Sequence, residues 1–327
     1  MLLVGDIGGT KTHLALFEDE KSRTPYLEKK FPSQEYPGLT EIVKEFLAIR
    51  ALKGVDIRLA CFGVAGPVLD RRCKATNLPW VIDGPLLEKE VTIGRVGVIN
   101  DLEANAYGLS VLKEEEFFVL NTGKEKQGNQ GLIAAGTGLG QACLYWDGKA
   151  HSPFACEGGH ADFAPRDEME MELLRYLRKQ FGHVSYERVL SGPGLYQLYR
   201  FLIDMQLEKE HPEMRRKFSL EDPPMAITKA ALDGTCNVSI RAVRWFLSIY
   251  GAESGNLALK FFSLGGVFLG GGMAPRLKSL FDRGDFMRGF LDKGRFQPLL
   301  EEMPIKIVLN DNAALLGALR YAREFMG

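Results

Sequence analysis

Short apolar runs separated by glycine-rich turns recur along the first hundred residues of the chain. Met1–Val4 and His13–Phe17 are rich in strand-forming residues and lack the three-to-four spacing of a helix, so both are predicted to be strands. The glycines between them predict a tight turn that joins the two strands. Asp56–Phe62 and Val96–Ile99 are further apolar runs, and each predicts another strand.

Helical patterns alternate with these strands. Leu39–Ala51 has apolar residues at helical spacing, and residues 102–106 predict a helix directly after the strand at 96–99. Further along, Leu207–Pro224 mixes both charges and ends in two prolines, which predicts a solvated loop. Strands that alternate with helices indicate an α/β fold. The helices predicted between residues 167 and 250 are Met169–Lys179, Pro193–Asp204, Ile227–Leu232 and Val238–Tyr250.

The order of these elements repeats within the chain. Gly131–Tyr145 again consists of an apolar strand, a glycine–threonine turn and an apolar strand. Residues 305–314 repeat the strand, the Asn-Asp pair and the helix start of residues 96–106. The repeats suggest an internal duplication, whose two turns would bind a polyphosphate from both sides of a cleft.

The first turn, GDIGGTKT at residues 5–12, misses the P-loop pattern G-x-x-x-x-G-K-[ST] only because Thr10 replaces a glycine. A P-loop opens a helix whose N-terminus binds phosphate, whereas a strand is predicted after Thr12. We therefore interpret the turn as a phosphate-binding hairpin in which Asp6 faces a metal or phosphate oxygens, with an ordinary glycine-rich turn as the alternative. Gly136–Gly140 is likewise followed by Gln141 and a strand, so a Rossmann fingerprint is rejected.

Composition and charge narrow the class of partner. The 327 residues are 46% hydrophobic with a net charge of −1, so the chain can bury a large core and lacks the basic surface of a nucleic-acid binder. Leu257–Met273, the longest apolar region, is interrupted by Lys260 and glycines, and the N-terminus lacks signal-peptide features. We expect a soluble, cytoplasmic protein with a small-molecule partner, no nucleic acid and no membrane. The five cysteines are scattered, which argues against disulfides and a cysteine-rich zinc site.

Several polar residues suit chemistry on a sugar. Asp101 is expected at the carboxyl end of its strand, where its carboxylate can take a proton from a hydroxyl that attacks phosphorus. Spacing alone does not distinguish it from Asp311 in the repeat. Glu157 and His160 flank two glycines and offer the donors and acceptors that a polyol needs, and Glu187 is a third candidate carboxylate. The alternatives are helix N-caps for the aspartates, a surface turn for the Glu–His pair and a salt-bridged helix position for Glu187.

Residues 265–276 form a further glycine-rich segment with a predicted strand between its glycines. Bare backbone at such glycines can lie against a flat ring or a ribose. The alternative is a strand–helix junction whose glycines serve packing alone.

Taken together, these segments resemble the bacterial glucokinase family, the zinc-free ATP:glucose 6-phosphotransferases of the hexokinase/actin-like superfamily. The resemblance implies an α/β, two-lobed, actin-like ATPase (ribonuclease H-like) fold with a central cleft. It extends over nearly the whole chain in the family's order, through GDIGGTK, Asn100-Asp101, AGTGLG, EGGHADFAPR, GHVSYERVLSGPGL (182–195), GGVFLGGGMAPR, KGRF (293–296) and Asn310-Asp311-Asn312.

The resemblance also implies roles for individual residues. Asp101 would be the general base for the glucose 6-hydroxyl. The sugar would be bound by Asn100, Asp101, Gly138, Glu157, His160 and Glu187. ATP would be bound by Gly5, Asp6, Ile7, Gly8, Gly9, Thr10, Gly136, Thr137, Gly138, Gly265, Gly266, Gly270 and Gly271. Asp6 would hold Mg²⁺ through water. Because the family is often dimeric, a homodimer is one expected assembly.

Water competes with the sugar as nucleophile, so we expect two lobes that close on the substrate. The predicted domains are a small α/β domain of residues 1–110 and 309–327 and a large α/β domain of residues 111–308 with a helical insertion. Hinges are predicted near residues 108–112 and 308–311.

Alternative functions remain open at this point. The enzymatic one is a kinase for another hexose or an N-acetylhexosamine. A non-sugar actin-like ATPase should lack the Glu157–His160 set, and a non-catalytic sugar sensor should lack Asp101. The absence of cysteine from residues 161–178 argues against the zinc-containing repressor/kinase family.

Overall fold

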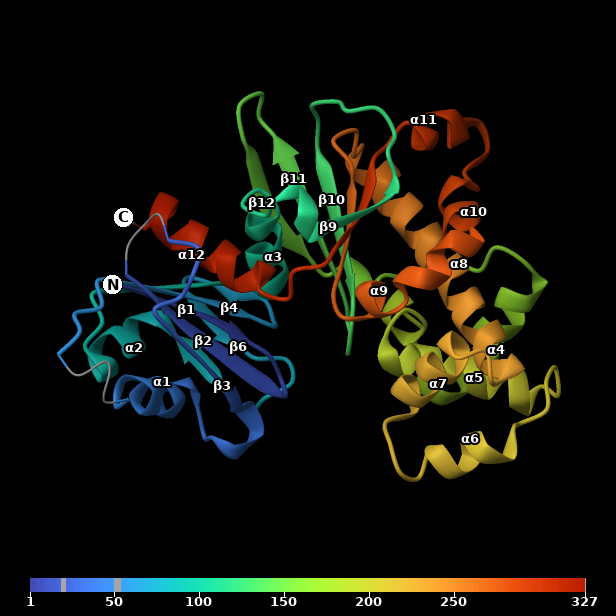
Figure 1. Ribbon diagram of the computed structural model, residues 1–327, viewed down its shortest axis with the longest axis horizontal. Helices are drawn as coiled ribbons and strands as arrows, with labels where there is room; N and C mark the ends of the chain where they lie inside the picture. Colours follow the sequence, from blue (N-terminus) through green and yellow to red (C-terminus); the bar gives the residue numbers. More distant parts are fainter. Residues whose placement is uncertain (19–21, 50–53, 327) are drawn as a thin grey trace. The chain divides into compact units, whose positions relative to one another are not determined.

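The computed structural model describes residues 1–18, 22–49 and 54–326 of the chain. It divides into two units (Figure 1). The first unit comprises Met1–Glu114, Pro153–Ala155 and Asn310–Gly327, and the second comprises Glu115–Ser152 and Cys156–Leu309. The chain thus passes from the first unit to the second after residue 114 and returns after residue 309, so the C-terminal helix belongs with the N-terminal sheet.

The first unit is built on a five-stranded sheet in the order β3-β2-β1-β4-β8. β1 pairs antiparallel with β2 and parallel with β4, and β4 pairs parallel with β8. A three-stranded sheet, β5-β6-β7, follows β4 in the chain. The strands are β1 (Leu2–Ile7), β2 (Lys11–Phe17), β3 (Leu27–Pro32), β4 (Leu59–Val64), β5 (Val68–Leu69), β6 (Arg72–Lys74), β7 (Val81–Asp83) and β8 (Arg95–Asn100).

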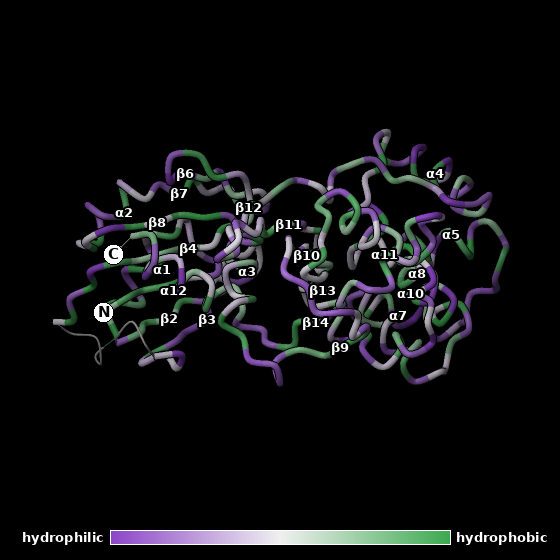
Figure 2. The backbone as a smooth tube through the Cα atoms, turned by 90° about the horizontal axis from the view of Figure 1, so that it is seen from above, coloured by the Kyte–Doolittle hydropathy of each residue, from purple (hydrophilic) through white to green (hydrophobic). Residues whose placement is uncertain are grey.

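Helices cover both faces of this sheet, which is why its central strands are apolar on both sides and appear largely green in Figure 2. Leu3 and Ile7 of β1 pack with α1 and α2, whereas Leu2 and Val4 pack with α3 and α12. Since side chains alternate along a strand, Asp6 lies on the α3 side. The helices are α1 (Leu39–Leu47), α2 (Gly84–Val91), α3 (Asp101–Leu109) and α12 (Ala313–Phe325). Residues 50–51 of the predicted first helix lie outside the described residues.

The second unit contains a six-stranded sheet in the order β12-β11-β10-β13-β14-β9. β10 pairs antiparallel with β11 and parallel with β13, and β13 pairs parallel with β14. This is the pairing of β1, β2, β4 and β8 again, which confirms the predicted duplication. The strands are β9 (Phe117–Asn121), β10 (Gln130–Ala135), β11 (Leu139–Trp146), β12 (His151–Cys156), β13 (Val267–Gly270) and β14 (Ile305–Val308).

The remaining helices form the insertion between β12 and β13 and the segments around β14. They are α4 (Glu168–Phe181), α5 (Gly192–Asp204), α6 (Pro212–Lys217), α7 (Pro223–Leu232), α8 (Asn237–Phe261), α9 (Met273–Arg276), α10 (Asp285–Leu291) and α11 (Gln297–Glu301). Leu207–Pro224, predicted to be a loop, contains α6. Pro212 in the first turn starts this helix and Met214, only 2% exposed, anchors it to the core. No helix within the described residues is both long and apolar enough to cross a lipid bilayer.

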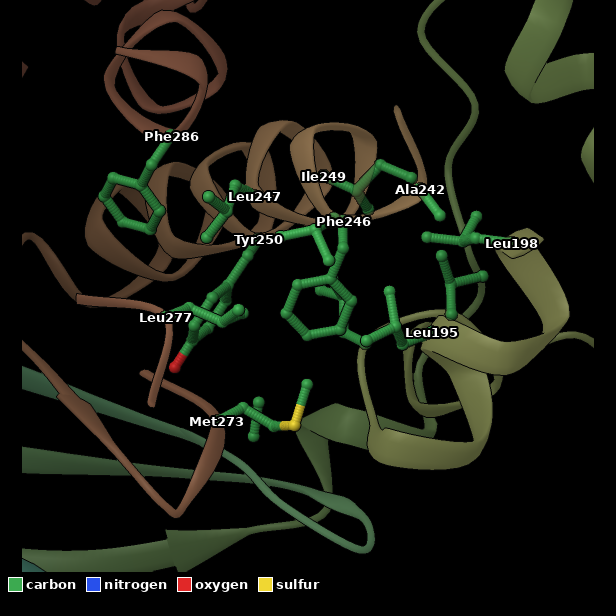
Figure 3. Packing of buried hydrophobic residues seen from close by; sticks show 14 of the residues in the cluster. Leu195, Leu198, Ala242, Phe246, Leu247, Ile249, Tyr250, Met273, Leu277 and Phe286 are labelled. Atoms are coloured by element: carbon green, nitrogen blue, oxygen red, sulfur yellow. The ribbon is translucent and has the colours of Figure 1, made fainter. Parts of the chain in front are cut away.

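The core of the second unit gathers around α8 (Figure 3). Phe246 of α8 points toward Leu195 of α5 and toward Met273, and Tyr250 of the same helix lies beside Leu277. The Tyr250 hydroxyl donates a hydrogen bond to the Ile133 carbonyl of β10, 3.0 Å away. The long helix is therefore fixed to the sheet by a buried polar contact as well as by apolar packing.

Candidate active site

In the first unit, the carboxyl ends of three parallel strands lie side by side. Ile7 of β1 pairs with Val64 of β4, and Val64 pairs with Asn100 of β8. Asp6 therefore lies at the same edge of the sheet as the Asn100-Asp101 pair, as expected for ligand-binding residues in an open α/β sheet.

Asn100, rather than Asp101, is the N-cap of α3. Its side-chain oxygen accepts hydrogen bonds from the amides of Leu102 (2.9 Å) and Glu103 (3.3 Å). Its side-chain nitrogen donates to the Gly66 carbonyl at 3.1 Å, which fixes the orientation of the amide. The cap frees Asp101 for the first helical position, where its Oδ1 accepts from the Leu102 amide at 3.0 Å. The positive end of the helix dipole at this position favours negative charge.

Asp6 and Asp101 interact electrostatically across this edge of the sheet. Burial, and in smaller part the negative charge of Asp101, raise the pKa of Asp6 to about 6. Gly63 of β4 lies between their strands, and a Cβ there would be 3.7 Å from the Asp101 Cα and 2.9 Å from the Ala104 Cβ. The bare backbone at Gly63 lets the start of α3 approach the sheet, which brings the two carboxylates together.

The turn between β1 and β2 is the predicted hairpin rather than a P-loop, because β2 follows it directly. Ser33, which is fully buried, holds this turn from the side. Its hydroxyl donates to the Gly8 carbonyl at 2.8 Å, and its amide donates to the Thr10 carbonyl at 3.0 Å. Since the Ser33 proton is used there, the Thr12 hydroxyl donates to the Ser33 oxygen, 2.9 Å away. These bonds fix the carbonyl directions in the hairpin.

In the second unit, the repeated hairpin lies against Glu187. The Glu187 Oε2 accepts a hydrogen bond from the Leu139 amide at 3.0 Å. A Cβ on Gly138 would be only 2.6 Å from the same oxygen, so the turn and the carboxylate are in direct contact. Among the described residues, Oε1 of Glu187 has no such bond and remains available to a ligand. The salt-bridged helix position that was the alternative for Glu187 is not observed.

Glu157 and His160 lie at the short 3₁₀ helix η4 (Gly158–His160). Their side chains are 61% and 55% exposed, with 3.8 Å between Oε2 of Glu157 and Nε2 of His160. Gly159 between them is buried, and a Cβ there would be 1.9 Å from the Leu139 carbonyl oxygen. The turn can therefore lie flat against β11 only with glycine at this position, which brings the Glu–His pair next to the strand that Glu187 contacts.

A family model described as Glucokinase matches residues 3–325. The glucokinase of Trichormus variabilis is 41% identical over 97% of this chain and 97% of its own length. The glucokinase of Shigella dysenteriae serotype 1 is 35% identical over 99% of this chain and 98% of its own length. A crystal structure of glucokinase from an Antarctic psychrotroph superposes with a TM-score of 0.81 at 30% identity, covering 98% and 97% of the two chains. The chain belongs to the glucokinase family.

This membership confirms the family predicted from the motifs, and the structural likeness confirms the actin-like α/β fold. The glycine-rich segment around β13, however, is divided between two ends of the sheet. Gly270 is the last residue of the strand and Gly271 follows it, where a Cβ on Gly271 would be 2.4 Å from the Ala135 carbonyl next to the Gly136 turn. Gly265 and Gly266 precede the strand, about 13 Å away along it. Gly265 lies against Gly128 and Gln130, and Gly266 against Pro304, at the opposite end of β13 from the Gly136 turn.

Three residues of this glucokinase-family chain support the site but were not among the residues predicted to form it. They are Gly63 beneath Asp101, Gly66 whose carbonyl orients Asn100, and Ser33 beside the first hairpin. Gly63 and Gly66 stand in the run GVAGP at the end of a predicted strand, and this pattern could have indicated a close backbone contact there. Ser33 is far from the hairpin in sequence and had none.

Proposed function

We propose that this glucokinase-family chain transfers the γ-phosphoryl group of ATP to the 6-hydroxyl of glucose, with Asp101 as general base. The observation that carries the proposal is the position of Asp101. It is the first residue of α3, where Asn100 and not Asp101 is the N-cap, and it lies near Asp6 at the carboxyl edge of the first sheet. The glucokinase relatives, matched over nearly their full lengths, support the substrate and the reaction.

The proton chemistry needs a carboxylate that is ionised and held in place. Asp101 takes the proton from the 6-hydroxyl as that oxygen attacks the γ-phosphorus, while the bond from phosphorus to the bridging oxygen of ADP breaks. The Leu102 amide and the α3 dipole favour its charged form. Most of the remaining work is positioning and electrostatic stabilisation of the moving phosphoryl group.

Asp6 fits a magnesium ion on structural grounds. Mg²⁺ prefers one or two carboxylates together with water and phosphate oxygens, and a carboxyl group whose pKa is raised to about 6 beside a second acid gains from a nearby cation. When bound, Mg²⁺ would neutralise charge on the β- and γ-phosphates. Asp6 would then hold and orient water in its coordination shell.

The two hairpins and the second-unit turns are proposed to bind the rest of the substrates. The turns of residues 5–10 and 136–138 would bind phosphate oxygens, through groups other than the Gly8 and Gly136 amides, which donate to the Lys11 and Gly138 carbonyls. Gly270 and Gly271 would lie beside the adenosine. Glu157, His160, Glu187 and Asn100 would bind the sugar hydroxyls. A wrong isomer would leave some of these groups unpaired, which is a strong basis for selecting stereochemistry.

The test is a comparison of initial rates of ADP release with glucose, mannose, fructose, N-acetylglucosamine and N-acetylmannosamine, at fixed ATP and Mg²⁺. We expect glucose to give the highest kcat/KM and the product to carry phosphate at O6 by nuclear magnetic resonance. A higher kcat/KM for another sugar would make that sugar the substrate. ATP turnover that does not depend on any sugar would instead favour a non-sugar actin-like ATPase.

The Ser33 contacts predict a defect confined to the nucleotide. Ser33→Ala removes the bonds to Gly8 and Thr12 from a buried position, so the hairpin should bind phosphate less well. We expect the KM for ATP to rise about tenfold, with the KM for glucose nearly unchanged. Ser219→Ala is the matched control, because the Ser219 hydroxyl makes only an exposed local bond to the Arg216 carbonyl. An unchanged KM for ATP in Ser33→Ala would remove this role.

A further inference from the structure

Glu253 in the middle of α8 is a carboxylate with no exposed surface. Its two oxygens are both engaged: Oε1 accepts from the Gln141 side-chain nitrogen at 2.8 Å, and Oε2 accepts from the Asn256 side-chain nitrogen at 2.9 Å. The Lys260 ammonium lies 3.9 Å from Oε1. A buried charge is costly unless it is paired and hydrogen-bonded, so this arrangement is tightly constrained. None of the proposed steps of the reaction involves Glu253.

The first arm of this network leads to the Glu157–His160 turn. Gln141 of β11 is 2% exposed, and because its NH₂ group donates to Glu253, its side-chain oxygen faces the other way. That oxygen lies 2.1 Å from the position a Cβ on Gly158 would occupy. The Gln141 amide therefore packs directly on the backbone of Gly158, between the two polar side chains of the turn.

The second arm leads to Glu187. The Asn256 side-chain nitrogen also donates to the Tyr186 hydroxyl at 3.1 Å, so Asn256 links Glu253 to Tyr186. Burial, followed by the Glu253 charge, raises the pKa of Tyr186. Tyr186 opens the 3₁₀ helix η5 (Tyr186–Arg188) and is the residue directly before Glu187.

The backbone joins the same two turns. The Tyr186 amide donates to the Ala161 carbonyl at 3.0 Å, one residue beyond His160. The Phe163 amide donates to the Val184 carbonyl at 2.9 Å, next to a bridge between Asp162 and Ser185. These backbone contacts run parallel to the side-chain network, which spans from Gly158 through Gln141, Glu253 and Asn256 to Tyr186. A shift of either end is therefore transmitted to the other through the buried Gln141–Glu253 bond and the part-buried Asn256 bonds.

We propose that Glu253 is a positioning residue that fixes the spacing between the Glu157–His160 turn and Glu187. This rests on the proposed function, in which those three side chains bind one sugar. A hexose presents hydroxyls at fixed separations, so a change in spacing weakens several hydrogen bonds at once and lowers discrimination between isomers. The Gly136–Gly138 turn touches Glu187, whereas the side chains of Gln141 and Asn256 donate to Glu253 and not to a nucleotide turn. The effect should therefore fall mainly on the sugar.

The test is Glu253→Gln. Glutamine has nearly the same shape, but its NH₂ group replaces one of the two acceptor oxygens and would face the NH₂ group of Gln141 or Asn256, so that one hydrogen bond is lost. We expect the KM for glucose to rise about tenfold, the KM for ATP to stay within about twofold, and the preference for glucose over mannose to fall. The double variant Gln141→Glu/Glu253→Gln restores a donor–acceptor pair between positions 141 and 253. It should recover most of the glucose KM. Tyr186→Phe, a milder change, should raise the glucose KM about threefold.

Asp285→Asn is the matched control. Asp285 is 6% exposed in the same unit and is paired with Arg244 and Arg288, so its loss should lower the melting temperature without changing the glucose KM. Three results would each overturn the positioning role. The first is an equal increase of the glucose KM and the ATP KM in Glu253→Gln. The others are an unchanged glucose KM in Glu253→Gln and Tyr186→Phe, and a rise of the glucose KM in Asp285→Asn. Those outcomes leave the proposed function intact, which fails only if the unaltered chain does not phosphorylate glucose.

Discussion

Asp101→Ala is expected to lower kcat by about 10²–10⁴-fold while glucose binding remains measurable. The side chain lost is the proposed base, whereas the sugar contacts of the second unit are unchanged. Asn100 still caps α3 in this variant, through its bonds to the amides of Leu102 and Glu103, so the helix start should persist. The measurements are ADP release under saturating substrates and glucose binding by calorimetry.

Asp311 offers an internal control for this prediction. It follows β14 and precedes α12, as Asp101 follows β8 and begins α3, so the duplication places the two aspartates in equivalent stretches. Asp311 is exposed and lies before its helix, whereas Asp101 is the first helical residue. Asp311→Ala should therefore leave kcat within about twofold. Near-normal turnover in Asp101→Ala, or an equal loss in Asp311→Ala, would remove Asp101 from the role of base.

The elements that the sequence predicted well are those defined by local pattern. The two hairpins follow from apolar runs on either side of glycines, and the repeat follows from finding that pattern twice. The alternation of side chains along β1 then determines which face of the sheet Asp6 lies on. Leu2 and Val4 pack against α3 and α12, so Asp6 lies on that same face. The local pattern therefore predicted that Asp101 follows the carboxyl end of its strand, and β8 does end at Asn100.

What the sequence could not supply depends on contacts between distant segments. The bond from Ser33 to Gly8 and the bond from Gln141 to Glu253 join residues 25 and 112 positions apart, and no short motif encodes either. The strand predicted between the glycines of residues 265–276 is β13 (Val267–Gly270), a local pattern like the hairpins. That Gly265, Gly266, Gly270 and Gly271 bind the nucleotide stays a prediction.

The N-cap alternative was resolved by geometry of the same kind. Asn100 and Asp101 are both good capping residues, and sequence alone leaves either able to cap the helix. The structure assigns the cap to Asn100 because its side-chain nitrogen is held by the Gly66 carbonyl of a distant loop. Asp101 is then the first residue of the helix, and the proposal that it acts as the base is what the first prediction tests.

Asp6→Asn is expected to lower kcat at least a hundredfold and yet stabilise the substrate-free protein at about pH 8. The loss of kcat follows from removing the carboxylate proposed to hold Mg²⁺. The gain in stability follows from the pKa of Asp6, which burial and the charge of Asp101 raise from 3.8 to about 6. An acid whose folded pKa is raised contributes stability that is fully present below the unfolded pKa, near 3.8, and is lost as the pH rises through 6.

At about pH 8 the Asp6 carboxylate of the unaltered protein is therefore ionised although it is partly buried. Asparagine has a similar shape and no charge, so the variant avoids this cost. We expect the melting temperature of Asp6→Asn to exceed that of the unaltered protein by about 2–4 °C at this pH, and the difference to vanish near pH 4. Asp147→Asn is a control of opposite sign, because hydrogen bonds from the amides of Ala150 and Lys149 lower the pKa of Asp147. Thermal unfolding without nucleotide or Mg²⁺ measures both. A lower melting temperature for Asp6→Asn at pH 8 would show that the ionised Asp6 carboxylate stabilises the substrate-free fold, and would contradict this prediction.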